Sequence, residues 1–184
     1  SERISATGEV LVPLLEAELE ALGDRLEAEG VESVAVCFLH AYAFPQHERA
    51  VGDFLRQRLP QVQVSLSFEV LPERREYERT ATTTVNAYVR PLMQRYLKGM
   101  RTGMQGMDVE APLLIMQSAG GLTPESDAAI RPVFALESGP AAGVLAAGFM
   151  AKRLGLDHII TLDMGGTTAK ASMIEAGEMA YSAE

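Results

Sequence analysis

Helical and strand periods alternate near the start of the chain, and this rhythm constrains the fold most strongly. Leucines spaced four, three and four residues apart predict a helix over 13–30. The short apolar run 33–39 predicts a buried strand, and Pro45 is placed to begin a second helix. Residues 62–68 then alternate between apolar and polar, as in a strand with one buried face. This α-β-α-β order predicts an α/β fold with mixed sheets covered by helices.

Apolar residues return to a helical period from about residue 76 to residue 100. The expected inner face of that helix consists of Tyr77, Ala81, Thr84, Val85, Tyr88, Val89 and Leu92. Pro91 lacks an amide donor and is expected to kink the helix or divide it. The glycine- and methionine-rich segment 98–108 is the best linker candidate, so we expect a boundary between domains or lobes there.

The composition excludes several classes of protein. Sixteen basic and twenty-five acidic residues among 184 give a net charge of −9, which argues against a nucleic-acid surface. Cys37 is the one cysteine, so no internal disulfide forms, and its apolar run "VAVCFL" favours a small buried side chain. The apolar stretch 141–151 is too short to cross a bilayer, and without a signal peptide we expect a cytoplasmic protein.

The two ends of the sequence suggest a piece of a longer protein. The chain begins at "SERIS" without a methionine and stops at "MAYSAE", just after an expected hairpin turn. A strand at the very end of a chain has few partners within it. We therefore expect further polypeptide beyond the residues given.

The stretch "TLDMGGTTAK", 161–170, is the main candidate for a binding site. A phosphate site needs several backbone N–H groups directed at one point, and Gly165, Gly166 and Thr167 could supply them. Asp163 at the strand end could hold Mg²⁺ through its waters. The motif matches neither the P-loop nor the dinucleotide-binding fingerprint.

A plain hairpin explains the same stretch about equally well, with glycines that serve a type I′ or II′ turn. The hydroxyl groups of Thr167 and Thr168 would add donors in the phosphate-binding alternative. Alternation along the strand favours a Lys170 side chain that points away from the phosphate face.

Two more turns in the same half of the chain resemble ligand-binding turns. In "ESGP", Ser138 is a plausible N-cap beside Gly139, and a helix start of this kind can hold an anion, although an ordinary cap is favoured. In "QSAGG", Ser118, Gly120 and Gly121 form a second strand-end glycine turn. Because α/β folds bind ligands at the carboxyl ends of parallel strands, three such turns favour a nucleotide cleft.

Two charged segments have ordinary explanations. The spacing of His40 and His47, with Glu48 beside the second histidine, matches no standard metal site, so polar loop residues are the favoured interpretation. The segment "EVLPERREYERT", 69–80, is read as a solvated face unless Arg74, Arg75 or Arg79 faces the cleft.

Five strings together resemble the hydantoinase A/5-oxoprolinase family, which includes N-methylhydantoinases. They are "VAVCFLHAYAFPQHE", "EVLPERREYERTATTTVNAYV", "LLIMQSAGG", "ESGPAAGV" and "TLDMGGTTAKASMI". The resemblance follows the family's order over nearly the whole chain. Relatives in that family include the ATP-using subunits of acetone and acetophenone carboxylases.

The resemblance implies the fold of the actin, hexokinase and heat-shock ATPase superfamily, with ATP between two ribonuclease-H-like lobes. Asp163 and the residues through Thr168 match the second of two phosphate turns, and the first is expected upstream of Ser1. The chain would then hold the end of lobe one at 1–75, a connecting helix and linker at 76–108, and the start of lobe two at 109–184.

The resemblance also implies an ATP- and Mg-dependent hydrolase of cyclic amides with a hydantoinase B-like partner subunit or domain. An ATP-dependent ketone carboxylase subunit, a non-catalytic nucleotide-binding module and a sugar-kinase-like enzyme remain alternatives. No general base is identified, and Phe68 stands where many relatives carry a histidine. We expect the 184-residue chain alone to be inactive, because half of the phosphate site is missing.

Overall fold

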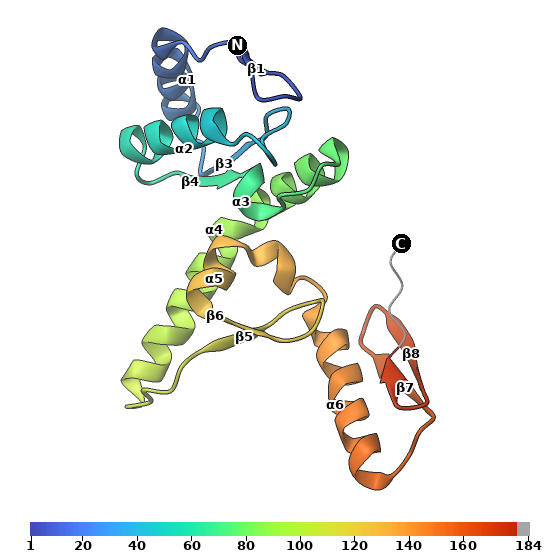
Figure 1. Ribbon diagram of the computed structural model, residues 1–184. Helices are drawn as coiled ribbons and strands as arrows, with labels where there is room; N and C mark the ends of the chain where they lie inside the picture. The colour runs from blue at the N-terminus through green and yellow to red at the C-terminus, as the bar shows by residue number, and fades with distance from the viewer. Residues whose placement is uncertain (180–184) are drawn as a thin grey trace. The chain divides into compact units, whose positions relative to one another are not determined.

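The computed structural model describes residues 1–179, which form two compact units. Unit 1 comprises Ser1–Ala111 and Ala129–Val133, and unit 2 comprises Pro112–Ala128 and the residues from Phe134 onward. Parallel and antiparallel strand pairs both occur, with helices packed on them, so the expected α/β class with mixed sheets is confirmed (Figure 1).

Unit 1 is built on two parallel strands, β3 (Ser33–Val36) and β4 (Gln63–Leu66). Helix α1 (Glu16–Ala28) precedes β3, and α2 (Gln46–Arg58) connects the two strands, which confirms the α-β-α-β order. A short hairpin, β1 (Arg3–Ile4) with β2 (Val10–Val12), comes before α1. The buried core lies between these strands and α2 and consists of Val36, Val51, Leu55, Leu59, Val62, Val64 and Leu66.

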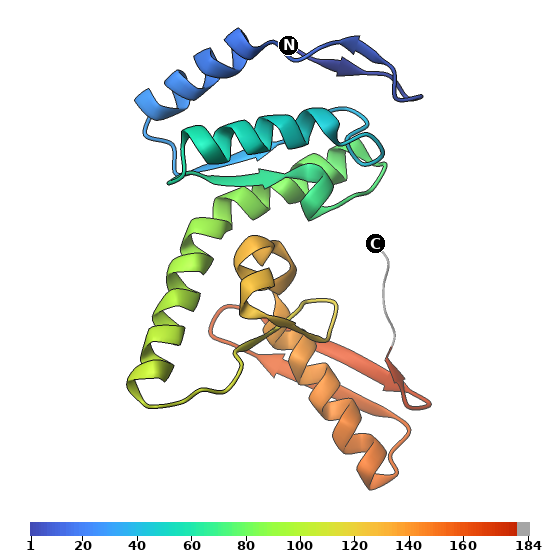
Figure 2. The same cartoon turned by 60° about the vertical axis from the view of Figure 1, so that its left-hand side comes forward.

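Strand β4 differs from the expected strand in length and in burial. Val64, Ser65 and Leu66 are all buried, so both faces of β4 are covered rather than one. Figure 2 shows α2 on one face of the strand pair and α4 on the other. Phe68 lies beyond the strand, in the short helix α3 (Ser67–Val70), so its inclusion in a strand was wrong.

Helix α4 (Glu76–Gly106) is a single helix of 31 residues that contains Pro91. Pro91 does not divide it, and the ribbon bends where its colour turns from green to yellow-green (Figure 2). The segment 98–108, which we expected to be a linker, is helical as far as Gly106, and the boundary between the two units follows it at Ala111 and Pro112. Lysine, arginine, glutamine and methionine in this segment favour a helix and offset its glycines.

The buried face of α4 is polar over most of its first half, opposite to the prediction, and Ala87 and Leu97 are its buried apolar residues. Arg79, Thr83 and Asn86 are buried, whereas Tyr77 and Tyr88 are 82% and 86% exposed. Polar groups tolerate burial when they find hydrogen-bond partners, and here backbone and side-chain groups around β3 and β4 provide them. The apolar stripe of the sequence therefore does not mark the side of α4 that packs on the strands.

Asn86 also ties the segment Ala129–Val133 to unit 1. Its Nδ2 donates to the Ile130 carbonyl at 3.1 Å, and its Oδ1 accepts from the Val133 amide at 3.2 Å. The same Nδ2 lies 3.0 Å from the Ser65 hydroxyl oxygen on β4. One buried amide thus joins three segments that are distant in the sequence.

In unit 2 the residues as far as Met179 form two antiparallel sheets and one long helix. Strands β5 (Leu114–Met116) and β6 (Leu122–Pro124) form a hairpin, followed by α5 (Glu125–Ile130) and a 3-10 turn at Pro132–Ala135. Helix α6 (Ser138–Leu154) ends at Gly155, whose φ of 67° lies in the left-handed region, as the glycine predicts. Strands β7 (Ile159–Met164), β8 (Ala169–Glu175) and β9 (Glu178–Met179) follow, and the predicted turn at 176–177 is confirmed.

Among residues 1–179, no helix is long and apolar enough to cross a membrane.

Candidate functional site

The candidate phosphate turn connects β7 and β8. These strands pair over six positions, from Ile159 opposite Ile174 to Met164 opposite Ala169. The amide of Gly165 donates to the Thr168 carbonyl at 2.9 Å and closes the turn. The turn residues Gly165–Thr168 are all exposed.

The two glycines of this turn are required neither by the backbone nor by packing in the described structure. Gly165 and Gly166 both have φ outside the left-handed region, so the turn is not of type I′ or II′. A Cβ atom on Gly166 would meet no described atom within 4 Å, and one on Gly165 would meet only the Thr168 carbonyl oxygen at 3.8 Å. The sequence also suggests a plain hairpin with a type I′ or II′ turn. The hairpin is present, but the predicted turn type is wrong. The open space leaves the backbone accessible to a ligand.

Asp163 and Lys170 are direct cross-strand partners in this hairpin. Because opposed residues of an antiparallel pair point to the same face, Lys170 lies on the same face as Asp163. The expectation from alternation would hold only if the phosphates lay on the opposite face. The Lys170 ammonium group forms an ion pair with the carboxylate of Glu137. This pair brings the turn end of the hairpin next to the start of α6.

Helix α6 begins differently from the prediction. Glu137 is the N-cap residue and has a left-handed backbone with φ of 60°, while Ser138 is the first helical residue. No side chain caps the helix start, so the prediction of a Ser138 cap was wrong. The Glu137 side chain instead pairs with Lys170, and the first-turn amides of the helix are left without intrahelical acceptors. A Cβ atom on Gly139 would enter open space among the described residues.

A cavity of about 530 Å³ lies between α6 and the β7–β8 hairpin. Small and apolar residues of α6, including Pro140 and Gly143, form one wall. The other wall presents a polar row from the two strands: Thr161, Asp163, Lys170 and Ser172. The cavity thus carries a carboxylate, an ammonium group and two hydroxyl groups.

The turn at Ser118–Gly121 has a conformational explanation. It connects the antiparallel strands β5 and β6, and Gly120 and Gly121 have φ of 87° and 86°, which only glycine adopts readily. The Ser118 amide and hydroxyl both donate to the Phe134 carbonyl, at 2.7 and 2.8 Å. Both glycine turns connect antiparallel strands, so the rule for the ends of parallel strands does not by itself support a ligand at either turn. A place for Ser118, Gly120 and Gly121 in a nucleotide cleft stays a prediction.

Only part of the predicted site is brought together within unit 2. The turn at 165–168 lies near the start of α6 through the Lys170–Glu137 pair. A Cβ atom on Gly120 would lie 3.3 Å from a Leu145 methyl group, so the other turn packs beside a later part of the same helix. Leu145 is seven residues beyond Ser138, which corresponds to about 10 Å along a helix axis.

Unit 1 contains a buried polar cluster that the sequence did not predict. His47 and Glu48 were read as polar loop residues, but they lie on α2 and are only 9% and 0% exposed. His47 Nδ1 lies 2.6 Å from a carboxylate oxygen of Glu2. No group of three or more potential metal ligands occurs within residues 1–179.

The Glu48 carboxylate gathers donors from the ends of both parallel strands. It accepts the Phe38 amide at 2.6 Å and the Phe68 amide at 3.1 Å, which follow β3 and β4. It also accepts the Ser67 hydroxyl at 2.6 Å. Burial raises the pKa of Glu48, while these three donors and the charge of Arg79 oppose that rise.

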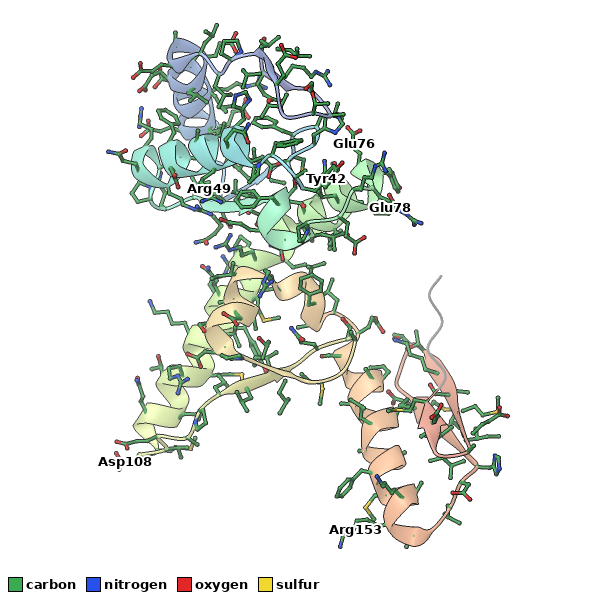
Figure 3. All side chains as sticks on the ribbon, in the orientation of Figure 1. Tyr42, Arg49, Glu76, Glu78, Asp108 and Arg153 are labelled. Atoms are coloured by element: carbon green, nitrogen blue, oxygen red, sulfur yellow. The ribbon has the colours of Figure 1, made fainter. Side chains whose placement is uncertain are left out.

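Arg79 completes the cluster from α4. It is 1% exposed and donates to the Ser67 hydroxyl oxygen and to the carbonyls of Glu73 and Phe38, at 2.9 to 3.1 Å. Its guanidinium carbon lies 5.6 Å from the ring centre of Tyr42, which is labelled in Figure 3. The interpretation of 69–80 as a solvated face is thus wrong for Arg79. A signal was present, because polar residues recur at 79, 83, 86 and 90 with helical spacing.

Comparison with known proteins gives a consistent family. Residues 79–184 match the family model described as hydantoinase/oxoprolinase, and residues 1–59 match that of its N-terminal region. The chain is 37% identical to the caprolactamase subunit alpha of Pseudomonas jessenii over 98% of its length, and 32% identical to the 5-oxoprolinase of Saccharomyces cerevisiae over 90%. It spans only 26% and 13% of those two relatives.

Two solved structures share the fold. The ATP-dependent caprolactamase of Pseudomonas jessenii superposes with a TM-score of 0.84 at 37% identity, over 94% of this chain and 25% of that one. Nucleotide-free acetone carboxylase superposes with a TM-score of 0.84 at 27% identity, over 97% of this chain and 26% of that one. The family resemblance read from the sequence is confirmed: this chain belongs to the hydantoinase/oxoprolinase family.

Proposed function

We propose that this chain is part of an ATP-dependent enzyme that opens cyclic amides, of the hydantoinase, N-methylhydantoinase or 5-oxoprolinase type. Two relatives support this proposal, because a caprolactamase and a 5-oxoprolinase both act on ring amides. The caprolactamase of known structure is, in addition, an ATP-dependent enzyme. In this proposal the chain supplies nucleotide-binding residues, and polypeptide outside it supplies the rest of the active site.

The observation that carries the proposal is the open glycine turn between β7 and β8. Gly165 and Gly166 need no positive φ and pack against no side chain among the described residues, and the close approach of a ligand would explain two glycines there. We assign the phosphate contacts to the backbone amides of Gly166 and Thr167 and to the hydroxyls of Thr167 and Thr168. Gly165, whose amide already donates to the Thr168 carbonyl, contributes a backbone that a phosphate can approach closely. Backbone amides in such a turn suit phosphate because they can approach it closely.

The residues present also fit a magnesium ion. Asp163 is exposed at the end of β7 and lines the cavity beside the turn. Mg²⁺ with a nucleotide keeps several waters and needs one or two carboxylates. A single aspartate beside the phosphate turn is therefore an adequate donor set for a hydrated ion.

When bound, ATP would supply a phosphoryl group that makes the reluctant amide reactive. This chain would then position the phosphoryl group and neutralise its charge. These two effects account for most of the catalysis of phosphoryl transfer. The turn amides would hold the phosphates, and Asp163 would hold a hydrated cation through its waters. The start of α6, with Ser138 and Gly139, adds the positive end of a helix dipole near the same place.

We further propose the two-lobed ribonuclease-H-like architecture of the actin, hexokinase and heat-shock ATPases. The parts would be the end of lobe one at 1–75, a connecting helix and linker at 76–108, and the start of lobe two at 109–184. The first phosphate turn would then lie in polypeptide outside this chain. A hydantoinase B-like partner is supported by the caprolactamase relative, which is itself a subunit.

A ketone carboxylase is the second candidate. It is favoured by the superposition on acetone carboxylase, whose TM-score of 0.84 equals that of the caprolactamase. The same phosphate turn would serve both reactions, because an enolate oxygen and an amide oxygen are both made reactive by phosphorylation. The phosphate turn of this chain therefore does not distinguish a cyclic-amide substrate from a ketone substrate.

The full-length protein, purified with its partner subunit, tests both candidates. Hydantoin, 5-oxoproline and caprolactam are each supplied with and without ATP, and ring opening and phosphate release are measured together. A parallel set supplies acetone with bicarbonate. Ring opening that requires ATP supports the first candidate, and ATP-dependent carboxylation supports the second. ATP hydrolysis without turnover of any amide or ketone would contradict both and favour a non-catalytic nucleotide-binding module.

A further inference from the structure

Lys170 occupies a place that the proposed nucleotide contacts do not use. It lies directly across from Asp163 in the β7–β8 register and lines the same cavity. Its side chain is 39% exposed, so its ammonium group can reach both the protein and the solvent. A lysine beside a phosphate turn supplies a mobile positive charge with three donors.

The partner of Lys170 is a carboxylate that sits where an anion is favoured. Glu137 directly precedes α6, at the positive end of that helix, and pairs with the Lys170 ammonium group. The positive helix end and the ammonium group attract the Glu137 carboxylate, and they would attract the phosphate group of a ligand for the same reason. The Glu137 carboxylate thus occupies the position of a negatively charged ligand group.

The Lys170–Glu137 pair is also easily exchanged. The Glu137 side chain is 72% exposed, and exposed ion pairs contribute little to stability. Glu137 has a left-handed backbone, which costs a residue with a Cβ atom roughly 1 kcal/mol or more. A phosphate that replaced this carboxylate on Lys170 would give up little stability in unit 2.

We infer that Lys170 is a further phosphate-binding residue of the nucleotide site, and that Glu137 holds it in the ligand-free protein until a phosphate group replaces the carboxylate. The inference rests on the proposed nucleotide site at Gly165–Thr168. It adds a specific ligand exchange: the Lys170–Glu137 pair opens, and a Lys170–phosphate pair forms. Glu137 is then a competitor of the ligand rather than one of its contacts.

Binding measurements on the full-length protein with its partner subunit test this exchange. Dissociation constants for Mg·ATP and for inorganic tripolyphosphate with Mg²⁺ are measured by calorimetry for each variant. Lys170→Met is expected to weaken both ligands by roughly tenfold or more, since a charge-assisted hydrogen bond is lost. Glu137→Gln is expected to tighten both by about threefold or more, because the competitor loses its charge. Lys152→Met, on an exposed lysine of the last turn of α6, is the control and leaves both constants unchanged.

The double variant separates ligand exchange from a general change in charge. If Glu137 acts through Lys170, Glu137→Gln has no effect in the Lys170→Met background. Equal tightening in both backgrounds would overturn the exchange, and so would wild-type affinity in Lys170→Met. Thermal unfolding of each variant shows whether the fold is intact. If the wild-type protein binds neither ligand, the proposed nucleotide site itself is wrong, which is a different result from an unaffected Lys170→Met.

Discussion

Glu48 and Arg79 are joined by a single hydroxyl group, that of Ser67, which donates to the Glu48 carboxylate at 2.6 Å and accepts from Arg79 Nε at 3.1 Å. The same carboxylate holds the amides that follow β3 and β4. Helices α2 and α4 therefore meet through one buried charge network at the carboxyl ends of the parallel strands. This is the end of a parallel sheet at which α/β proteins carry their ligand-binding loops.

Arg79→Met should destabilise unit 1 strongly. The substitution leaves the Glu48 charge buried without its cationic neighbour and the carbonyls of Glu73 and Phe38 without these donors. Removing one charge from a buried network has a cost similar to that of breaking a buried ion pair, roughly 3–5 kcal/mol. Hydrogen exchange of the α4 amides in the full-length protein, read by mass spectrometry, measures the loss as faster exchange.

Arg75→Met is the matched control for that experiment. Arg75 is at the start of the same helix, its side chain is 77% exposed, and it pairs with Glu78 at 3.4 Å. An exposed pair contributes less than about 1 kcal/mol, so α4 exchange should change little. Equal effects of the two substitutions would show that the Glu48–Arg79 network does not stabilise the unit.

The order of elements in unit 1 follows from the sequence, but its polar core does not. Leucine spacing and Pro45 predict α1 and α2 because local period and proline stereochemistry decide those helices. The burial of Arg79 depends on Ser67 and Phe38, which lie 12 and 41 residues away in the sequence. No local pattern distinguishes an arginine with buried partners from an arginine in water. The predicted inner face of α4 was wrong for the same reason, because the local apolar pattern does not show which side of the helix finds buried partners.

Cys37 should react slowly with alkylating reagents. Burial raises the pKa of its thiol, and the negative charge of Glu48 raises it further, against smaller opposite effects of Thr83, Thr80 and Arg79. The thiolate is the reactive form, so a raised pKa leaves less of it at pH 8 than in a free cysteine. Iodoacetamide labelling of the Cys37 peptide is followed by mass spectrometry from pH 7 to 10. The rate should rise at a higher pH than that of a model thiol, and a coincident profile would contradict the effect of burial.

Asp163→Asn should impair the magnesium-dependent reaction of the full-length protein. The substitution removes the carboxylate charge from the end of β7 while keeping a side chain of the same shape. Loss of an outer-sphere metal partner typically costs about 10- to 100-fold in affinity or activity. The magnesium dependence of ATP hydrolysis measures the effect, and raised Mg²⁺ should recover part of the rate.

Asp157→Asn is the control, since Asp157 is an exposed aspartate before β7 and does not line the cavity beside the turn.

The 184-residue chain alone is expected to hydrolyse no ATP, because half of the proposed phosphate site lies outside it. Magnesium-dependent turnover by that chain, abolished by Asp163→Asn, would contradict the two-turn arrangement.

The sequence predicted the glycine turn of the candidate site but not the residues that surround the turn. The glycine pair and Asp163 are adjacent in sequence, so a local motif reveals them. The pairing of Lys170 with Glu137 depends on the β7–β8 register and on where α6 begins. Ser138 shows the limit of local cap rules. The helix begins one residue earlier than the rules predict, so Ser138 is its first residue and Glu137 is the N-cap.

The last prediction compares two glycines that both have open space around them but differ in backbone conformation. A Cβ atom would meet no described atom within 4 Å at either Gly166 or Gly121, but φ is 86° at Gly121 and lies outside the left-handed region at Gly166. Gly121→Ala should therefore cost about 1–2 kcal/mol in stability, because alanine is strained at that φ. Gly166→Ala should change stability by less than about 0.5 kcal/mol.

Nucleotide binding should show the reverse order. The methyl group of Gly166→Ala enters the space that we assign to the phosphates and should weaken Mg·ATP binding by about tenfold or more, the cost of a lost charge-assisted contact. Gly121→Ala should weaken Mg·ATP binding less than Gly166→Ala does, because we assign the phosphates to the turn at 165–168. Thermal unfolding and calorimetric titration of the two full-length variants provide the comparison. If Gly166→Ala binds Mg·ATP as the wild type does, the open glycine turn is not the phosphate site, whatever the rest of the enzyme does.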